Sequence, residues 1–401
     1  MSDLATARLQ EPILIFDRIG ENRRKTRFLL FGLVLAVFPF LFYIALLFGE
    51  WIGFLIVLSL GEHRPDGDLL AVFVFSAVTA LALAFVVAYV TYRVAMSMAL
   101  STRGARPLAD DEEQRLRRIV ENLCIGAGLP APKLHLIESP TTNAYSTGRD
   151  PTSAALVVTR GLLEALDDRE LEGVVAHELS QIGNEDIRPA TLAGSIATIL
   201  CPPLLLLFLV RGVLPRLLRR GQIVGIIGLI LLSPILLALI WLSVSQIMLI
   251  AFLPLLLPEV ISLVAVQMSL ASAEDTRGIL VAGLLIIPLY GFYVAPVIGF
   301  LMRRAACRQY EFRADADALL LSRHPSGLAR ALVKMSMRRK ASFRVDPAVS
   351  HLYIVNPLGS RFWSWILATQ PPLEQRLAAL VRMSGIDPRE LQDAARPPVQ
   401  A

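Results

Sequence analysis

One segment of the chain carries side chains whose types and spacing suit metal-dependent hydrolysis. It reads GVVAHELSQIGNED, and on a helix it places His177, Glu178 and Gln181 at positions i, i+1 and i+4. This pattern differs by one residue from His-Glu-x-x-His, in which two histidines one turn apart bind a zinc ion and the glutamate polarises the metal-bound water. The segment therefore indicates a metal site, with a solvated or capped histidine on a helix face as the alternative.

A second segment, much later in the chain, offers acidic side chains at helical spacing. It reads RRAACRQYEFRADADAL and places Glu311 and Asp315 one turn apart. We expect Glu311 to supply a carboxylate ligand and Asp315 to accept a hydrogen bond from a ligand imidazole, which fixes the ring tautomer and raises its basicity. The alternative is a charged helix that leaves a membrane with its arginines at the level of the lipid headgroups.

The residues before the first segment predict the elements that would hold it. Asp167, followed three residues later by Glu170, forms a capping box that begins the helix of His177. Upstream we expect an amphipathic helix at 109–127, a strand at 133–139, a turn-rich stretch at 139–148 and a second strand at 154–159. These elements predict an α+β unit.

The composition excludes an ordinary soluble enzyme. Hydrophobic residues make up 55% of the 401 residues and charged residues only 18%, with a mean hydropathy of +0.58. The apolar residues gather in five uncharged runs, each longer than the roughly 20 residues that cross a bilayer, at 28–49, 69–92, 189–210, 221–258 and 278–302. The chain is therefore expected to be a mainly α-helical, polytopic membrane protein with soluble parts.

The basic residues predict its orientation. Several arginines and a lysine precede the first run, whereas Arg64 is the only arginine or lysine in the loop after it. By the positive-inside rule the N-terminus is cytoplasmic, and two crossings return the chain to the cytoplasm. Because the first run lacks a cleavage pattern, no removable signal peptide is expected.

The two charged segments that flank the later runs must lie on one side if they form one unit. The later runs then cross an even number of times, either four, or two with 189–210 re-entrant around Pro202 and Pro203. The expected division begins with a cytoplasmic N-terminal segment (1–27) and two transmembrane helices (28–98). The first half of the soluble domain (101–188), two to four further transmembrane helices (189–302) and the second half of the soluble domain (303–395) follow.

Other function classes find less support. The cysteines Cys124, Cys201 and Cys307 are too far apart for a Cys-x-x-Cys site. The isoelectric point is about 9.3, but no basic stripe with interleaved aromatic residues suggests nucleic acid. A transporter would need ionisable groups inside the spans, whereas Glu259 and Glu274 stand at the edges of the runs.

With both segments in place, the chain resembles the HtpX family of membrane zinc metallopeptidases, relatives of the CAAX prenyl proteases. The resemblance runs in order through NAYSTG, a Thr-x-Gly-Leu turn, HELSQIGNED, the Glu-x-x-Ala-Asp helix and ATQPPLEQRLAAL. It implies a zincin-like cytoplasmic metallopeptidase domain, split in sequence by the later spans. It also implies one zinc ion per chain and cleavage of membrane or misfolded proteins at the cytoplasmic face.

The resemblance also implies residue roles. The expected zinc ligands are His177, Gln181 and Glu311, with Glu178 as general base and Arg376 at the oxyanion. Asp315 and Asp186 would support the ligands, and the edge formed by Asn143, Ala144 and Tyr145 would pair with an extended polypeptide substrate.

Two departures from the family fall at histidine positions. Gln181 stands in place of the second zinc histidine and Gln370 in place of the histidine in Thr-His-Pro-Pro. A neutral amide oxygen is a weaker zinc ligand than an imidazole, and His351 is the substitute considered. The expected function is a zinc metalloendopeptidase of a bacterial inner membrane, with a catalytically inactive homologue that binds partners as the alternative. Partners are the bilayer and polypeptides, without nucleic acid, and nothing in the sequence indicates an oligomeric state.

Overall fold

The computed structural model describes residues 15–60, 68–101, 105–109, 111–201, 310–337, 352–355 and 371–385, with isolated positions between 205 and 302. The chain divides into two compact units. Unit 1 comprises 1–28, 103–191 and 306–401, and unit 2 comprises 29–102 and 192–305. Most of the later apolar runs expected to cross the membrane lie outside the described residues.

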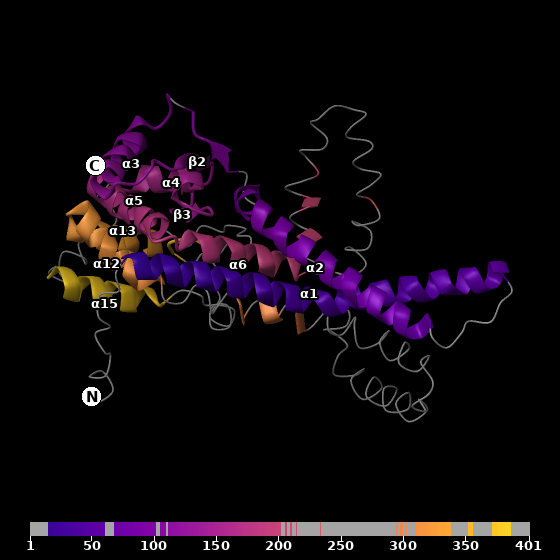
Figure 1. Ribbon diagram of the computed structural model, residues 1–401. Helices are drawn as coiled ribbons and strands as arrows, with labels where there is room; N and C mark the ends of the chain where they lie inside the picture. Colours follow the sequence, from indigo (N-terminus) through magenta and orange to yellow (C-terminus); the bar gives the residue numbers. More distant parts are fainter. Residues whose placement is uncertain are drawn as a thin grey trace, which may run out of the picture. The chain divides into compact units, whose positions relative to one another are not determined.

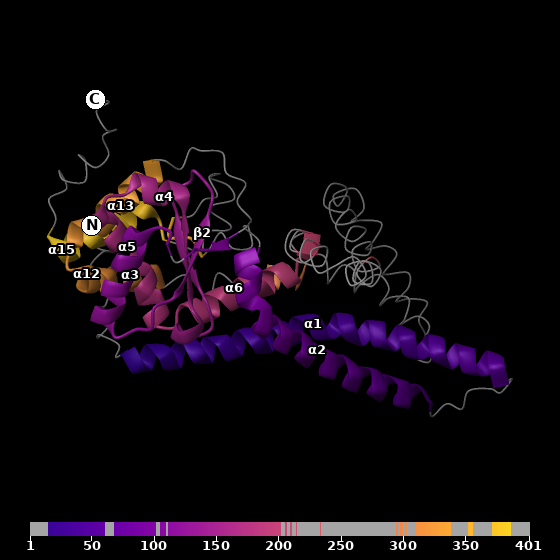
Figure 2. The same ribbon diagram turned by 90° about the horizontal axis from the view of Figure 1, so that it is seen from above.

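Unit 2 contains long apolar helices. They are α2 (Asp68–Ser101) and most of α1 (Ile15–Leu60), and Figures 1 and 2 show the two side by side. The rings of Phe42 and Phe73 meet edge to face with centroids 5.0 Å apart. Large apolar side chains such as Phe75, 70% exposed, point away from the protein. Each helix contains a stretch long and apolar enough to cross a membrane, at Arg18–Phe42 and Ala71–Leu100.

Unit 1 contains a small mixed sheet. Its strands, in the order β1-β2-β4-β3, are β1 (Arg106–Pro107), β2 (Lys133–Ile137), β4 (Ala155–Thr159) and β3 (Ala144–Thr147). β2 and β4 are parallel, and β3 pairs antiparallel to β4 with Tyr145 opposite Val157. The two strands expected from the sequence are present, and β3 forms at the sheet edge where turns were expected.

Helices complete unit 1. They are α3 (Gln114–Ala127), α4 (Arg160–Ala165), α5 (Asp168–Gly183), α12 (Tyr310–Ser322), α13 (Pro325–Met337) and α15 (Leu373–Ser384). Of these, α4 and α5 lie against the sheet, and the others pack against α5 or one another. A sixteen-residue helix, α5, lies among them, packed against α12, α13, α3 and β3 (Figure 2). Its buried residues extend around most of the helix, so it is the central element of the unit rather than a surface helix.

The start of α5 is held by the expected capping box. The Glu170 amide donates to Asp167 Oδ1 and the Asp167 amide to Glu170 Oε2, both at 3.0 Å. The Glu170 carboxylate is buried, and Lys334 of α13 donates to it at 2.7 Å. The cap therefore also fixes α13 against α5.

Gly173 lets α5 and α13 approach closely. A Cβ atom at this position would lie 2.4 Å from the Leu328 amide nitrogen and 2.8 Å from its Cα. Because these are backbone atoms, no side-chain rotation relieves the clash. The two helices would have to separate.

We therefore expect Gly173→Ala to destabilise the domain by about 1–3 kcal/mol, the usual cost of overpacking. Gly126→Ala is the matched control, because nothing lies within 4 Å of a Cβ at this position of α3 and alanine favours a helix by about 1 kcal/mol. Thermal unfolding of the detergent-solubilised chain should show opposite shifts for the two variants. Equal shifts would contradict the close approach.

Candidate active site

Two segments far apart in sequence meet at the centre of unit 1. His177 of α5 is fully buried, and its Nε2 lies 3.5 Å from Glu311 Oε2 of α12. The tight packing of α5 against α12 produces this contact. The histidine and the carboxylate singled out from sequence are therefore neighbours.

A chain of charged groups holds the imidazole from behind. His177 Nδ1 lies 2.9 Å from Asp315 Oδ1, close enough for an ion pair. Arg376 of α15 clamps the same carboxylate, with Nε 2.8 Å from Oδ2 and Nη2 2.7 Å from Oδ1. With Nδ1 committed to Asp315, Nε2 is the ring nitrogen that faces Glu311, and this arrangement is typical of a metal-binding histidine.

The pKa values follow from burial and this pairing. Burial lowers the pKa of His177, but Asp315 and Glu311 outweigh that effect and raise it to about 9. Burial alone would raise the pKa of Asp315, whereas Arg376 and His177 bring it below its usual range. Without a cation the ring is therefore protonated at neutral pH, and a bound cation would have to displace the Nε2 proton.

Gln181 occupies the next turn of α5, beside the same ring nitrogen. Its Nε2 lies 3.1 Å from His177 Nε2, and its Oε1 lies 3.5 Å from the Ser146 hydroxyl. Rotating the amide by half a turn exchanges its oxygen and nitrogen, and a serine hydroxyl can serve either as donor or as acceptor. The side chain can therefore turn its oxygen toward a protonated imidazole or toward a cation.

These separations suit one metal ion. Donors at zinc–nitrogen and zinc–oxygen distances in a tetrahedral site lie about 3.3 Å apart. His177 Nε2 lies 3.5 Å from Glu311 Oε2 and 3.1 Å from Gln181 Nε2, the position that Gln181 Oε1 takes when the amide turns over. Within the described residues, no group of three or more His, Cys, Asp and Glu side chains could hold a metal. The donor set thus comprises two strong ligands and the weaker Gln181 oxygen.

Glu178 follows His177 on α5, and Ser146 of β3 is the polar neighbour that acts on its carboxylate. Its side chain is fully buried. Burial raises its pKa to about 7, although His177 and Ser146 oppose the shift. A carboxylate with this pKa can take up and release a proton near neutral pH.

The edge expected to bind substrate already has a partner. Ile354 N donates to Ala144 O at 3.0 Å, and Val355 N donates to Asn143 Oδ1 at 3.3 Å. The ring of Tyr353 meets that of Tyr145 edge to face at 4.9 Å. The segment Leu352–Val355 therefore runs antiparallel to the start of β3, a role that our sequence analysis missed although the apolar and β-branched run LYIV was its signal.

Arg376 is committed to the scaffold by its contacts. Besides clamping Asp315, its Nη1 donates to Ile354 O at 2.6 Å and lies 3.1 Å from Glu311 Oε2. The side chain is 2% exposed. These contacts make it a positioning residue, and the oxyanion role stays a prediction.

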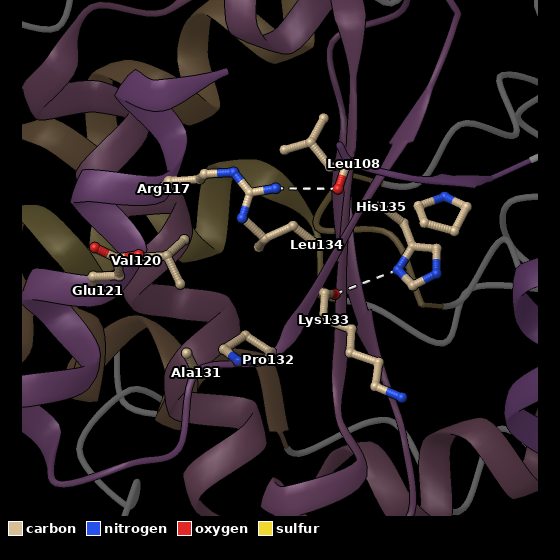
Figure 3. A pocket seen from close by; sticks show the side chains of 10 residues that line it. Leu108, Arg117, Val120, Glu121, Ala131, Pro132, Lys133, Leu134 and His135 are labelled. Carbon is tan, nitrogen blue, oxygen red and sulfur yellow. Dashed lines mark hydrogen bonds between the residues drawn. The ribbon is translucent and has the colours of Figure 1, made fainter. Parts of the chain in front are cut away.

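The spare histidines offer no replacement ligand among the described residues. His135 bonds through Nδ1 to Lys133 O at 3.3 Å, and it lines a pocket of about 470 Å³ between α3 and the β1–β2 edge (Figure 3). None of the expected site residues lines that pocket. His324 is exposed after α12. His63, His351 and Gln370 lie outside the described residues.

Asp186 lies beyond the last turn of α5. Its carboxylate accepts from Asn22 at 2.7 Å, and its backbone amide donates to the backbone carbonyl of Gln181 at 2.9 Å, at the end of the helix. We infer that it acts on the end of the helix rather than on the metal.

Comparisons with known proteins find relatives that match most of the chain. A "Protease HtpX homolog" from Dictyoglomus turgidum is 30% identical over 375 residues, covering 94% of this chain and 96% of the relative. A relative of the same description from Tropheryma whipplei is 29% identical over 370 residues, covering 92% and 99%. The crystal structure of S. mikatae Ste24p covers 84% of this chain and 67% of its own, with 19% identity and a TM-score of 0.40.

The family comparison spans both metal-bearing helices. The description "Peptidase family M48" matches residues 110–384, which include α5, α12 and α15. This family of metalloproteases generally uses zinc. The chain belongs to peptidase family M48 and is an HtpX-type homologue within it.

Proposed function

We propose that the protein is a membrane-embedded zinc metalloendopeptidase that cuts membrane or misfolded proteins at the cytoplasmic face. One observation carries the proposal. A buried imidazole, 2.9 Å from Asp315, presents Nε2 to the Glu311 carboxylate, and the buried carboxylate of Glu178 interacts electrostatically with both. This arrangement has the parts that metal-assisted peptide hydrolysis requires.

His177 Nε2, a Glu311 oxygen and Gln181 Oε1 would hold one zinc ion per chain. When bound, zinc polarises the scissile carbonyl and lowers the pKa of water. The chain's contribution is to fix the donors before the ion arrives: Asp315 and Arg376 set the ring, and Ser146 steadies the amide. Gln181, the weak third ligand, would lower the affinity for zinc but leave one zinc site per chain.

Glu178 supplies the proton transfers. Its carboxylate takes a proton from the attacking water and delivers it to the leaving amine nitrogen. Because the group is fully buried, no bulk water competes for that proton.

The substrate would lie extended along β3. Ala144 and Asn143 are used by Leu352–Val355, and in an antiparallel pair alternate residues face the outer edge. Ser146 is the next outward-facing residue and lies beside Gln181. We place the scissile peptide there, with Asn143, Ala144 and Tyr145 binding the substrate indirectly by holding the wall formed by Leu352–Val355.

Zinc content tests the donor set. We expect Gln181→His to bind zinc at least 10-fold more tightly than the parent chain, because imidazole is the stronger ligand. Glu311→Ala should lose the metal. Asp315→Asn should weaken binding by about 10–100-fold, the usual effect of losing a group that orients a ligand. Metal mass spectrometry and competition with a chelator measure all four proteins in detergent.

An affinity that does not change in Gln181→His would contradict the placement of residue 181 at the metal. A parent chain without zinc, beside a Gln181→His chain with one zinc per chain, would instead identify a peptidase scaffold that has lost its metal. It would also support the inactive, partner-binding alternative.

The catalytic role of Glu178 predicts a pH dependence. Activity needs the ionised carboxylate, so cleavage of unfolded, dye-labelled casein should rise with pH. The half-maximum should fall at or below about pH 7, because the pKa is about 7 without a cation and a bound cation lowers it.

Glu178→Gln should reduce kcat by about 10²–10⁴-fold with its zinc retained. Glu164→Gln, at an exposed position of α4, should leave activity unchanged. An acid limb centred well above pH 7, or an active Glu178→Gln chain, would remove Glu178 from the mechanism.

The orientation rests on the arginines before the first apolar run. We propose a bacterial inner membrane with unit 1 in the cytoplasm. In a chain whose natural cysteines are replaced by serine, Glu164→Cys should react with an impermeant maleimide only in inverted vesicles, and His63→Cys only in right-side-out vesicles. The reverse pattern would overturn the orientation.

A further inference from the structure

The start of the first long helix is built into unit 1. Asn22 of α1 is 2% exposed. Its side-chain nitrogen Nδ2 donates to the backbone carbonyl of Asn184 at 2.9 Å and to Asp186 Oδ1 at 2.7 Å. Asn184 is the residue that ends α5. One side chain of α1 therefore holds the C-terminal end of the helix that carries His177, Glu178 and Gln181.

The same stretch of α1 also reaches α12. Arg18 donates to Asp317 Oδ2 at 2.9 Å. That oxygen also accepts from Asn184 Nδ2 at 2.8 Å and from Ser180 Oγ at 3.2 Å. Asp317 thus joins α1, α5 and α12 at one point, one helical turn and a half beyond Glu311.

The backbone at this junction is in an unfavourable conformation that the junction itself stabilises. Glu185 has φ 56°, in the left-handed region that residues with a Cβ seldom adopt. Its carboxylate is held by Arg23 and Arg188, each at 3.0 Å. The chain turns here from α5 into α6 (Ile187–Ile199), so contacts from α1 hold the turn that ends the metal-bearing helix.

Asp186 makes Asn22 hard to replace. Its carboxylate is 5% exposed, and burial raises its pKa to about 7 against the opposing hydrogen bond from Asn22. Arg313, Lys25 and Asp317 also act on it electrostatically. A buried carboxylate with one strong donor depends on that donor.

We propose that Asn22 and Arg18 are positioning residues of the peptidase site: the cytoplasmic start of the membrane anchor sets α5 against α12, and with them the separation of His177 and Glu311. The inference rests on the proposed metallopeptidase function and adds a residue set that the metal site needs but does not contact. Helices are stiff over the two turns, about 10 Å, between His177 and Asn184, so a shift at their end moves the ligand. The anchor helix is then part of the catalytic unit.

Cobalt binding tests this role. In the full chain carrying Gln181→His, which supplies a strong third ligand, Co²⁺ is titrated and its visible ligand-field bands are recorded together with the thermal midpoint. Asn22→Asp places two carboxylates together and should weaken Co²⁺ binding at least 10-fold. The double variant Asn22→Asp/Asp186→Asn restores an amide–carboxylate hydrogen bond and should recover at least half of that loss on a logarithmic scale.

Two further variants complete the test. Arg18→Ala should weaken Co²⁺ binding and alter the bands through α12. Arg24→Ala, at an exposed position of the same helix, is the matched control and should bind Co²⁺ like its parent.

A merely structural role would lower the thermal midpoint of the variants and leave the bands and Co²⁺ affinity of the folded protein unchanged. That result, or a double variant no better than Asn22→Asp, overturns the inference while the proposed function stands. A parent chain without peptidase activity, beside Co²⁺ binding that responds to Asn22, overturns the proposed function and supports the positioning role. A Gln181→His chain that binds no Co²⁺ overturns both.

Discussion

The site depends on one buried pair of opposite charges. Asp315 is fully buried, and the Arg376 guanidinium against both of its oxygens, together with His177, holds its pKa below the usual range. Burying either charge alone would cost several kcal/mol. Together they provide a fixed acceptor for the His177 ring, and through Arg376 Nη1 they also hold the Leu352–Val355 segment beside β3. His177, the Leu352–Val355 segment and the C-terminal helix therefore share one electrostatic support.

The residues of the site come from distant parts of the sequence. Ligands on α5, α12 and the supporting arginine on α15 are separated by long stretches of sequence, so no local interaction can bring them together. Close helix packing does so: α5 packs against α12 and α13, and α15 packs against both of these. Gly173 permits the close approach of α5 and α13, and the Glu170–Lys334 pair holds it. At the other end of α5, polar groups hold the helix in place. Its neighbour there is the polar start of α1, before that helix becomes apolar after Phe28.

The local elements of the site could be predicted from sequence, and its long-range contacts could not. Asp167 and Glu170 are a capping signal with a local cause, and the structure shows both hydrogen bonds. The residues of β3 are too few for a periodic pattern, so the sequence predicts turns there, and only the family resemblance makes Asn143–Tyr145 an edge. They form a strand because they pair with β4. Asn22 carries no sequence signal at all, since its role comes from a partner 164 residues away. The number of later spans stays a prediction.

Gln181 changes what the site must do before it can hold a cation. A second histidine would present a lone pair with no rearrangement except loss of a proton. The amide instead must turn its oxygen inward, give up the contact between its nitrogen and His177, and leave the Ser146 hydroxyl to accept rather than donate. At the same time the two carboxylates favour a proton on His177, so cation and proton compete for Nε2. In the proposed mechanism, Gln181 would therefore act first on metal affinity and its pH dependence, while the Glu178 carboxylate would stay in place for proton transfer.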